Sequence, residues 1–464
     1  MKMSTIFNTD SYKVSHWRQY PPKTDIIGSY ITARGSSKFD GVLYAGLQAY
    51  LLEYLTKPIT KADIEEAALV YKVHGVELNV DGWTRILTRH DGLMPVDIYS
   101  IPEGSFVPTR TPLVQVFNTD VELPWVTSWI ETALLRAIWY MSTVATLSFH
   151  IKRDLIETAK ATGTRIELVD TMLHDMGARG CSSNESAMLG GIGHLINFGG
   201  TDTVASLIGA QRYYYCSICG YSIPAAEHST ITTWGKEYEV GAYRNMIEAY
   251  GTHGKMFAVV SDSYDIYHAV EHIWGEILKD EVEDSKATLV VRCDSGDPTV
   301  VPIEVIKKLM DKFGHFTNQK GFKVLPSCVR VLQSDGINRE QIKKILDALV
   351  DNGLALDNIA FGMGGALLQH PNRDDLSFSM KANIIYKDGS IRDVSKTPSG
   401  DTLKASDGGV YNVLRDENGT YTNVYDTSLS HKDGLMQLRY SNGKIRKDAS
   451  TTMMKMRDLA RSAL

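Results

Sequence analysis

The chain has 464 residues, of which 43% are hydrophobic, so it can bury a large core and divide into two or three domains. Its 55 acidic and 49 basic residues leave a formal net charge of -6, which excludes a global positive field for nucleic acid or anionic lipid. Five cysteines are too few and too irregularly spaced for a disulfide framework.

The N-terminal segment lacks the apolar core of a secretory signal. The most apolar helical stretch, Trp125 to Phe149, is interrupted by Glu131 and Arg136, which is untypical of a membrane span. We therefore expect a cytoplasmic protein.

Residues 1–145 mix helical and extended patterns and predict an N-terminal α+β domain. The stretch from Lys61 to Lys72 has helical spacing and strong helix formers. The stretch from Val96 to Pro102 alternates apolar and polar residues like a strand.

Residues 146–380 alternate short apolar runs with helix-like segments, a pattern that favours parallel strands. The apolar runs end in polar or glycine-rich turns at His174-Asp175, His228, Asp262, Asp294, Asp335 and Gly364. In the helical segment after Asp262, one face is expected to carry Ile266, Val270, Ile273, Trp274 and Ile277. The spacing of these turns is near one βα repeat and predicts an irregular β/α barrel, with its polar residues beyond the carboxyl ends of the strands.

Residues 381–464 read as hairpins and are expected to complete the N-terminal domain with a β-rich segment. The turn dipeptides are Asp388-Gly389, Asn418-Gly419 and Asn442-Gly443. The fold class is therefore α/β, with a barrel and an additional α+β domain built from both ends of the chain.

Three features of the barrel segment carry chemical interest, and each has a plainer alternative. His228 follows Glu227 in an abrupt turn, and a carboxylate such as Asp262 can fix its imidazole tautomer, although most histidines are structural. The turn around Gly364 can hold a phosphate on its backbone N–H groups, but a tight βα connection also needs glycine. Arg179, flanked by glycines, suits a loop that reaches for an anion, or it is an ordinary helix-face cation.

The aspartates Asp262, Asp294 and Asp335 have two interpretations. Asp is a favoured helix N-cap, so each can be explained singly by the helix that follows. Three at the same end of one sheet instead indicate a site for a polyol or a metal-bound phosphate.

With these residues in place, the chain closely resembles the nicotinamide phosphoribosyltransferase family along nearly its whole length. The matching segments are Thr9 to Lys13, Leu173 to Asp175, Gly200 to Val204, Pro224 to Thr230, Val260 to Tyr267, Arg292 to Gly296 and Asn358 to Gln369. The resemblance implies a homodimer with shared active sites that joins nicotinamide to 5-phosphoribosyl 1-pyrophosphate in NAD salvage. It also implies Mg²⁺ held mainly through substrate phosphates, not by a protein cluster, and ATP as co-substrate.

The resemblance assigns roles to individual residues. His228 is the expected phosphohistidine, with Asp262 orienting it and Glu227 beside it, and Asp294 contacts the ribose. The expected substrate-binding set is Tyr12 from the partner subunit, Met176, Arg179, Asp202, Ser263, Arg292, Ser334, Asp335, Gly364 and Gly365. Asp202 and Arg292 hold the carboxamide in this scheme. The expected phosphate and ATP ligands are Arg34, Arg373, Ser379, Lys381, Lys396 and Lys404.

The chain departs from the family pattern at two positions. Met176 replaces an aromatic residue on one face of the pyridine ring, and Ser334 replaces a glycine near the sugar phosphate. Two rival functions stay open: a nicotinate phosphoribosyltransferase, which differs in the carboxamide pocket, and a non-catalytic phosphosugar-binding signalling dimer.

Overall fold

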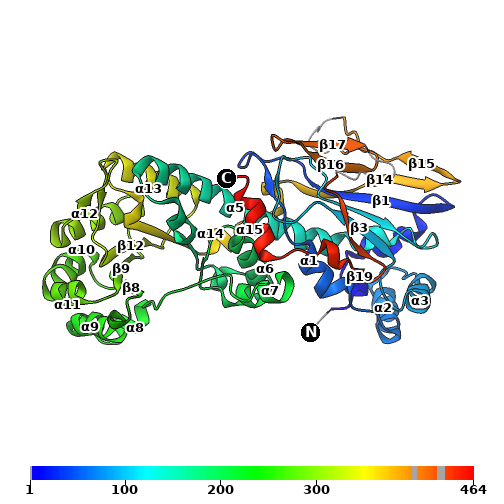
Figure 1. The fold of residues 1–464 in the computed structure, drawn as a ribbon. Coiled ribbons are helices and arrows are strands. Elements are labelled where there is room, and N and C mark those ends of the chain that lie inside the picture. The colour runs from blue at the N-terminus through cyan, green and yellow to red at the C-terminus, as the bar shows by residue number, and fades with distance from the viewer. Residues whose placement is uncertain (1–2, 400–404, 426–433) are drawn as a thin grey trace. The chain divides into compact units, whose positions relative to one another are not determined.

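The structure is a computed structural model that describes residues 3–399, 405–425 and 434–464, and it forms two compact units (Figure 1). The first comprises Met1–Thr146, Gly209–Ser217 and Pro371–Leu464, and the second comprises Leu147–Ile208 and Ile218–His370. The units differ from the predicted domains mainly in Gly209–Ser217 and residues 371–380, which belong to the first unit. Lys404 lies outside the described residues.

The first unit is built on a seven-stranded sheet in the order β15-β14-β1-β5-β3-β18-β19. These strands are β1 (Thr24–Ala33), β3 (Val96–Ser100), β5 (Val114–Asn118), β14 (Phe378–Lys387), β15 (Ser390–Asp393), β18 (Gln437–Ser441) and β19 (Lys444–Ile445). Strand β1 pairs antiparallel with β14, and β3 pairs antiparallel with β18. The two ends of the chain therefore share one sheet, which confirms the predicted α+β domain built from both.

All three predicted hairpin turns are confirmed. Asp388-Gly389 joins β14 to β15, and Asn442-Gly443 joins β18 to β19. Both residues of each pair have positive φ (50° and 77°; 46° and 86°), the conformation that type I′ hairpins require. Gly419, at φ 82°, lies in the turn between β16 (Tyr411–Arg415) and β17 (Tyr421–Tyr425). Local turn chemistry thus sets the strand register in this segment.

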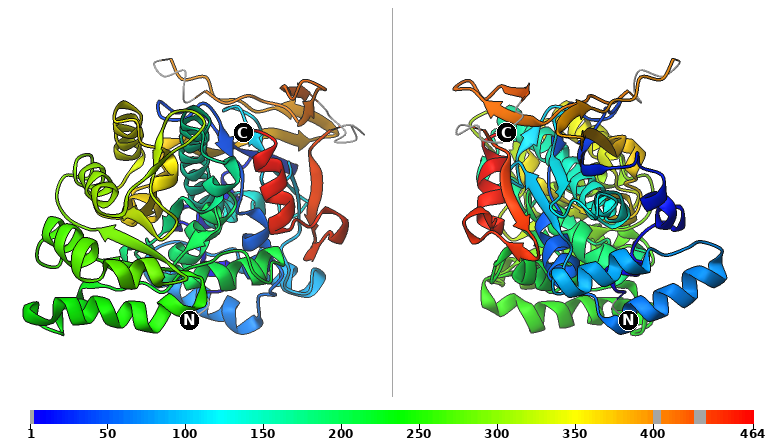
Figure 2. Two further views of the ribbon diagram at one scale, coloured as in Figure 1. Left: turned by 60° about the vertical axis from the view of Figure 1, so that its left-hand side comes forward. Right: turned by 90° about the vertical axis from the view of Figure 1, so that its right-hand side faces the viewer.

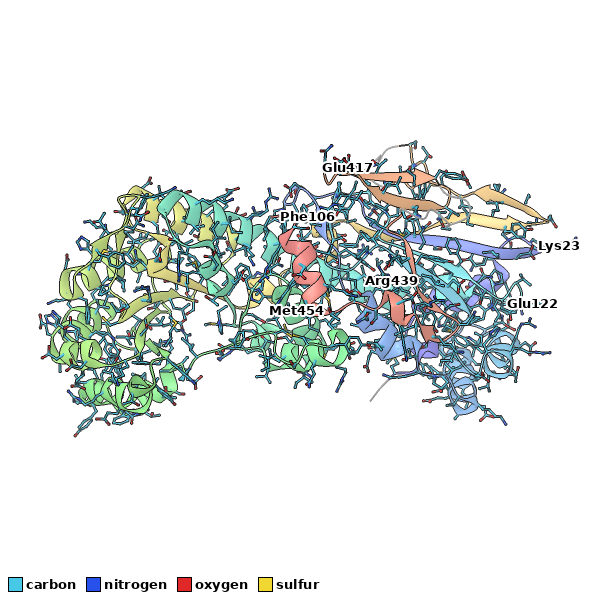
Figure 3. The ribbon with its side chains drawn as sticks, viewed as in Figure 1. Lys23, Phe106, Glu122, Glu417, Arg439 and Met454 are labelled. Carbon is cyan, nitrogen blue, oxygen red and sulfur yellow. The ribbon has the colours of Figure 1, made fainter. Side chains whose placement is uncertain are left out.

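Helices cover the first unit and bury a tryptophan cluster. They are α1 (Leu47–Tyr50), α2 (Lys61–His74), α3 (Val80–Arg89), α4 (Val126–Trp129), the first half of α5 (Glu131–Thr162) and α15 (Met453–Arg461), beside the short pair β2 (Val42–Leu43) and β4 (Phe106–Val107). Trp83, Trp125 and Trp129 are buried and meet edge to face. Figure 3 labels Arg439 on β18, inside this unit, and Lys23 at the tip of β1.

The second unit contains a parallel sheet in the order β7-β6-β13-β12-β9-β8. The strands are β6 (Leu173–Asp175), β7 (Gly200–Thr201), β8 (Met256–Val260), β9 (Thr288–Cys293), β12 (Val329–Gln333) and β13 (Ile359–Met363). A further extended segment pairs on both sides, through parallel bridges from Tyr221 to Gly200 and from Ala225 to Ala258. Because β7 and β8 are the two edges of the sheet, this segment closes it into an irregular barrel, which confirms the predicted fold class.

Helices pack outside the barrel (Figures 1 and 2). They are α6 (Asn184–Leu195), the start of α7 (Val204–Tyr214), α8 (His228–Thr232), α9 (Glu239–Tyr250), α10 (Ile266–His268), α11 (Lys279–Asp284), α12 (Val301–Phe313), α13 (Arg339–Asp351) and α14 (Gly365–Leu368), with the short hairpin β10 (Phe316–Thr317) and β11 (Lys323–Val324). Among the described residues, none of the helices has the length and apolar content needed to cross a bilayer.

The helical face predicted after Asp262 is only partly right. Ile266, Val270, Ile273 and Trp274 are buried, but Ile277 is 53% exposed. The backbone from Ala269 to Ile277 is π-helical, and its wider turn rotates later residues away from a face that an α-helical spacing predicts.

Candidate active site

The carboxyl ends of the barrel strands form one rim, which we define by the residues that follow those strands. The backbone continues the strand pairing beyond β6, since Met176 N donates to Met363 O and Asp202 N donates to Asp175 O. On the other side of the rim, Ser261 N donates to Arg292 O. The following predicted residues therefore lie on the same rim: Met176, Asp202, His228, Asp262, Asp294, Ser334 and Gly364.

Asp262, Asp294 and Asp335 are not helix caps. The residue that caps α10 is Asp265, whose carboxylate accepts from the N–H groups of Tyr267 and His268. Asn338 caps α13, and Val300 precedes α12. The plainer interpretation of Asp262, Asp294 and Asp335 is therefore excluded, and their positions need another explanation.

His228 faces two of these aspartates. Its Nε2 lies 3.3 Å from Asp294 Oδ2 and 3.8 Å from Asp262 Oδ1, while its Nδ1 lies 3.3 Å from Ser263 Oγ. Asp262 is only 3% exposed; its Oδ2 accepts from Asp294 N, but its Oδ1 has no hydrogen-bond partner. A buried carboxylate oxygen without a donor costs about 1 to 3 kcal/mol or more, so closer approach of the imidazole is favourable.

Glu227 does not share this geometry. It precedes α8, where its N–H donates to Thr230 Oγ1 and its carboxylate accepts from Ser229 Oγ. The contacts found for Glu227 therefore hold the start of α8 and the turn that carries His228, and none of them is to the imidazole.

Arg292, Asp294 and Ser334 form a tight cluster beside His228. Arg292 Nη2 lies 2.9 Å from Asp294 Oδ1, and Arg292 Nε donates to Ser334 Oγ at 2.8 Å. Ser334 Oγ in turn donates to Asp294 Oδ1 at 2.6 Å. Burial alone would raise the pKa of Asp294, but these hydrogen bonds and the charges of Arg292 and His228 hold it below its usual value. Asp294 is thus an ionised bridge between His228 and Arg292.

Asp202 has its own partners on the opposite part of the rim. Its Oδ1 lies 3.1 Å from His174 Nε2 and accepts a hydrogen bond from Ser222 Oγ. Burial would raise the pKa of Asp202, but His174, Ser222 and the charge of Arg292 lower it overall. Asp175, predicted as part of a polar turn, is instead the last residue of β6 and fully buried, bound to Gly177 N and Thr201 Oγ1.

The two departures from the family pattern are neighbours in space. A Cβ on Gly362 would lie 2.6 Å from Met176 Sδ and 3.0 Å from Ser334 Cβ. Met176 also packs against the small apolar cluster inside the barrel, which contains Ala258, Val290 and Leu332. Glycine at position 362 therefore makes room for both side chains, and the two replacements form one local change in the floor of the site.

The predicted phosphoribosyl cradle lies on the same rim. Arg179 is exposed in the 3₁₀ turn Ala178–Gly180, and Asp335 is exposed after β12. Gly180 approaches Gly365, since a Cβ on Gly180 would lie 3.1 Å from Gly365 Cα. The helix-like run predicted after Gly364 is only the four-residue α14. For binding a phosphate at this turn, the backbone N–H groups are therefore better candidates than a helix dipole.

The first unit carries the predicted basic residues. Ser379 and Lys381 lie two residues apart on β14 and so share a face of the strand. Burial lowers the pKa of Lys381; the nearby Glu131 opposes this shift, while Arg34, Lys396 and Lys13 add to it. Ser379 Oγ is buried without a hydrogen-bond partner, so this face is suited to an anion with acceptor oxygens.

Two other predicted residues, Arg373 and Tyr12, are exposed on the first unit. Arg373 is exposed in the 3₁₀ turn Arg373–Asp375 and lies 3.5 Å from Asp374. Tyr12 is 59% exposed in the 3₁₀ helix Ser11–Arg18, with Lys13 Nζ 5.3 Å from its ring centroid. Lys404 is not described.

Three residues near these sets, His174, Lys13 and Ser222, were not assigned roles from the sequence. His174 lies two residues before Met176, and side chains two residues apart in a strand point to the same face. This spacing is the signal in the sequence that places His174 and Met176 on one face. Lys13 is buried, and its Nζ lies 2.5 Å from Glu131 Oε2. The polar sequence around Lys13 gives no indication that this side chain is buried in an ion pair. Ser222 belongs to the closing segment, whose strand character depends on two isolated bridges.

The described residues contain no group of three or more His, Cys, Asp and Glu side chains arranged to hold a metal ion. Mg²⁺ often keeps several waters and binds through substrate phosphates, with few protein ligands.

Two family models match the chain. The sequence model of the nicotinate phosphoribosyltransferase (NAPRTase) family matches residues 171–437, which include the whole rim. The model of the nicotinamide phosphoribosyltransferase N-terminal domain matches residues 4–98. The barrel, its rim and the attached sheet are therefore those of a phosphoribosyltransferase.

Relatives define the family more narrowly. A nicotinamide phosphoribosyltransferase of Xanthomonas campestris pv. campestris (strain 8004) is 45% identical over 446 residues, 95% of each chain. One from Acinetobacter baylyi is 30% identical and covers 94% of this chain and 93% of its own. The chain belongs to the nicotinamide phosphoribosyltransferase family.

Solved structures agree at the level of the fold. The nicotinate-nucleotide pyrophosphorylase of Pyrococcus furiosus has a TM-score of 0.62 at 17% identity and covers 98% of this chain and 94% of its own. Human nicotinic acid phosphoribosyltransferase has a TM-score of 0.59 at 16% identity, with 98% and 93% covered.

Proposed function

We propose that the protein transfers the 5-phosphoribosyl group of 5-phosphoribosyl 1-pyrophosphate to nicotinamide, forming nicotinamide mononucleotide and pyrophosphate in NAD salvage. The observation that carries this proposal is the ionised Asp202 on the same rim as the Arg292–Asp294 pair. Family membership supports the same reaction class.

The chemistry follows from the charges. The pyridine nitrogen already has a lone pair, so it attacks C1 of the ribose without a base while the C1–pyrophosphate bond breaks. Positive charge grows on the ribose, where the carboxylate of Asp294 stabilises it. Negative charge grows on pyrophosphate, which the cationic side chain of Arg179 on the rim attracts, while Mg²⁺ would neutralise part of it.

Asp202 supplies the preference for the amide. An amide N–H donates to a carboxylate, whereas the carboxylate of nicotinate about 4 Å away would suffer roughly 4 kcal/mol of repulsion at an effective dielectric near 20. This difference is about a thousandfold in affinity.

The experiment incubates the purified protein with 5-phosphoribosyl 1-pyrophosphate, Mg²⁺ and either nicotinamide or nicotinate, and measures pyrophosphate release and the mononucleotide formed. Preferential turnover of nicotinamide supports the proposal. Preferential turnover of nicotinate favours the rival suggested by the family model over residues 171–437. No pyrophosphate release from either base favours a non-catalytic binding protein.

We further propose that ATP drives the reaction through phosphorylation of His228. One imidazole nitrogen attacks the γ-phosphorus, the bond to the ADP oxygen breaks, and the proton on the other nitrogen becomes part of a cationic ring. Asp294 and Asp262, 3.3 Å and 3.8 Å from Nε2, stabilise that cation. The unpaired Asp262 Oδ1 supports this role, because its attraction to the imidazole N–H becomes stronger when the ring is charged.

We also propose a homodimer in which Tyr12 completes the site of the partner subunit. The large exposed ring of Tyr12 supports this, since an aromatic face stacks on a flat heterocycle. Mixing Tyr12→Ala and Arg292→Ala chains tests it, because in a two-fold dimer each mixed pair regains one intact site. We expect about a quarter of the native rate after random exchange of subunits. A mixture no more active than its parents contradicts shared sites.

A further inference from the structure

His174 lies on the rim beside Asp202 but has no part in the reaction as described. Strand β6 pairs with β7 so that His174 is opposite Gly200, two residues before Asp202. A Cβ on Gly200 would lie 2.7 Å from His174 Nδ1, so a glycine there leaves space for the imidazole. The ring is thereby held against β7 with Nε2 3.1 Å from Asp202 Oδ1.

Because of this contact, the two carboxylate oxygens of Asp202 differ in their hydrogen bonding. Oδ1 takes His174 and Ser222, whereas no hydrogen bond to Oδ2 occurs among the residues that the structure describes. The side chain is 45% exposed, and Asp202 N is anchored to Asp175 O. Oδ2 is therefore the oxygen that is left for a donor on the substrate.

The other ionisable groups around Asp202 already have partners of their own. Arg292 carries a permanent charge, but Asp294 already compensates it at 2.9 Å. Asp175 on β6 is buried, which raises its pKa, and it binds Gly177 N and Thr201 Oγ1. His194 on α6 contacts Gly200 O from behind the strand. Imidazole is the ordinary side chain that changes charge between pH 5 and 8, and the imidazole of His174 lies in direct contact with Asp202, with 3.1 Å between Nε2 and Oδ1.

We propose that His174 sets the strength with which Asp202 selects an amide over a carboxylate, and that protonation of its imidazole relaxes this selection. The inference rests on the proposed function. A neutral His174 donates Nε2–H and leaves Asp202 as a full negative charge that repels nicotinate. A protonated His174 compensates that charge, so the carboxylate of nicotinate meets less repulsion, while nicotinamide keeps its hydrogen bond to Oδ2.

The test is the ratio of kcat/KM for nicotinamide to kcat/KM for nicotinate, measured from pH 5.5 to 8.5 with 5-phosphoribosyl 1-pyrophosphate and Mg²⁺. The ratio cancels differences in active fraction and in steps common to both bases. We expect the native ratio to rise by about tenfold across this range. In H174Q, whose side-chain amide is a donor that does not titrate, the ratio is expected to stay high and flat. In H174A it is expected to be flat but lower, because Oδ1 keeps only Ser222.

A flat native ratio, or an H174Q variant that keeps the native slope, overturns the role of His174 while leaving the proposed function intact. Preference for nicotinate throughout the range overturns the direction of selection. If neither base is consumed, the proposed function fails and this inference fails with it.

Discussion

Two histidine–aspartate contacts stand on the rim of the barrel, and they differ in how firmly the histidine is held. His174 Nε2 lies 3.1 Å from a single oxygen of Asp202, and its side chain is 17% exposed. His228 Nε2 lies 3.3 Å and 3.8 Å from oxygens of two aspartates, and its side chain is 46% exposed. The tighter contact suits recognition of a fixed group, whereas the looser one suits the phosphoryl transfer that we propose for His228.

Removing the exposed histidine is expected to have the largest effect. H228A should abolish both stimulation by ATP and incorporation of label from γ-phosphate-labelled ATP at an acid-labile site, while some basal transfer remains. The matched control is H272A, which removes another exposed histidine with a carboxylate partner, Glu276, and should keep the labelling. Acid-labile label in H228A at the native level would assign the phosphorylation to another residue.

Neutralising the carboxylate beside the tightly held histidine is expected to come next. D202N should lower the nicotinamide-to-nicotinate ratio by up to about a thousandfold, because the repulsion of nicotinate disappears. Competition between the two bases at equal concentration measures this ratio. D351N, an exposed change on α13, serves as the control and should keep the native ratio. Unchanged selectivity in D202N would remove Asp202 from this role.

The bridge that joins Asp294 to Arg292 predicts an intermediate effect with a defined pH dependence. Ionised Asp294 is present above its pKa and is lost as pH falls through it, and Ser334 is one cause of its lowered pKa. S334G should therefore raise that pKa, so that activity declines at a higher pH on the acid side. Loss of a hydrogen bond to a charged group, about 1.5 to 3 kcal/mol, predicts roughly a tenfold or larger fall in kcat/KM.

The pH profile of kcat/KM measures both changes in S334G. S334T keeps the hydroxyl group and should keep the acid limb of the native enzyme. An S334G profile identical to the native one would show that Ser334 does not position Asp294.

The smallest effect is expected at Met176, which packs against Ala258, Val290 and Leu332. M176F restores the aromatic residue of the family pattern, and aromatic and sulfur–aromatic contacts have overlapping energies of about 0.5 to 1.5 and 0.3 to 1.5 kcal/mol. The KM for nicotinamide should therefore change by less than about threefold. A change of tenfold or more in steady-state KM would mean that Met176 shapes the pocket in a way its size does not explain.

The common rim of Asp262, Asp294 and Asp335 could be predicted because these residues follow recognisable strand ends. Asp262, Asp294 and Asp335 each follow a strand within two residues, and parallel strands bring such positions to one edge, whereas Ser334 was assigned only through the family resemblance. Glu227 was less well predicted, since adjacency to His228 along the chain indicated a partner, whereas its observed contacts are with Ser229 and Thr230. Successive residues at a turn point in different directions, so sequence neighbours are poor guides to contacts there.

By itself, the sequence determined the local elements: the helix from Lys61, the strand from Val96 and the three hairpins, because capping, alternation and positive-φ turn residues act within a few positions. Only the tertiary structure decided that residues 221–226 close the barrel, that Ser222 and His174 share one oxygen of Asp202, and that Lys13 is buried against Glu131. These contacts join segments far apart in the chain or strands too short to show a period. Their partners are selected by packing and by the need to pair buried polar atoms, which no local pattern records.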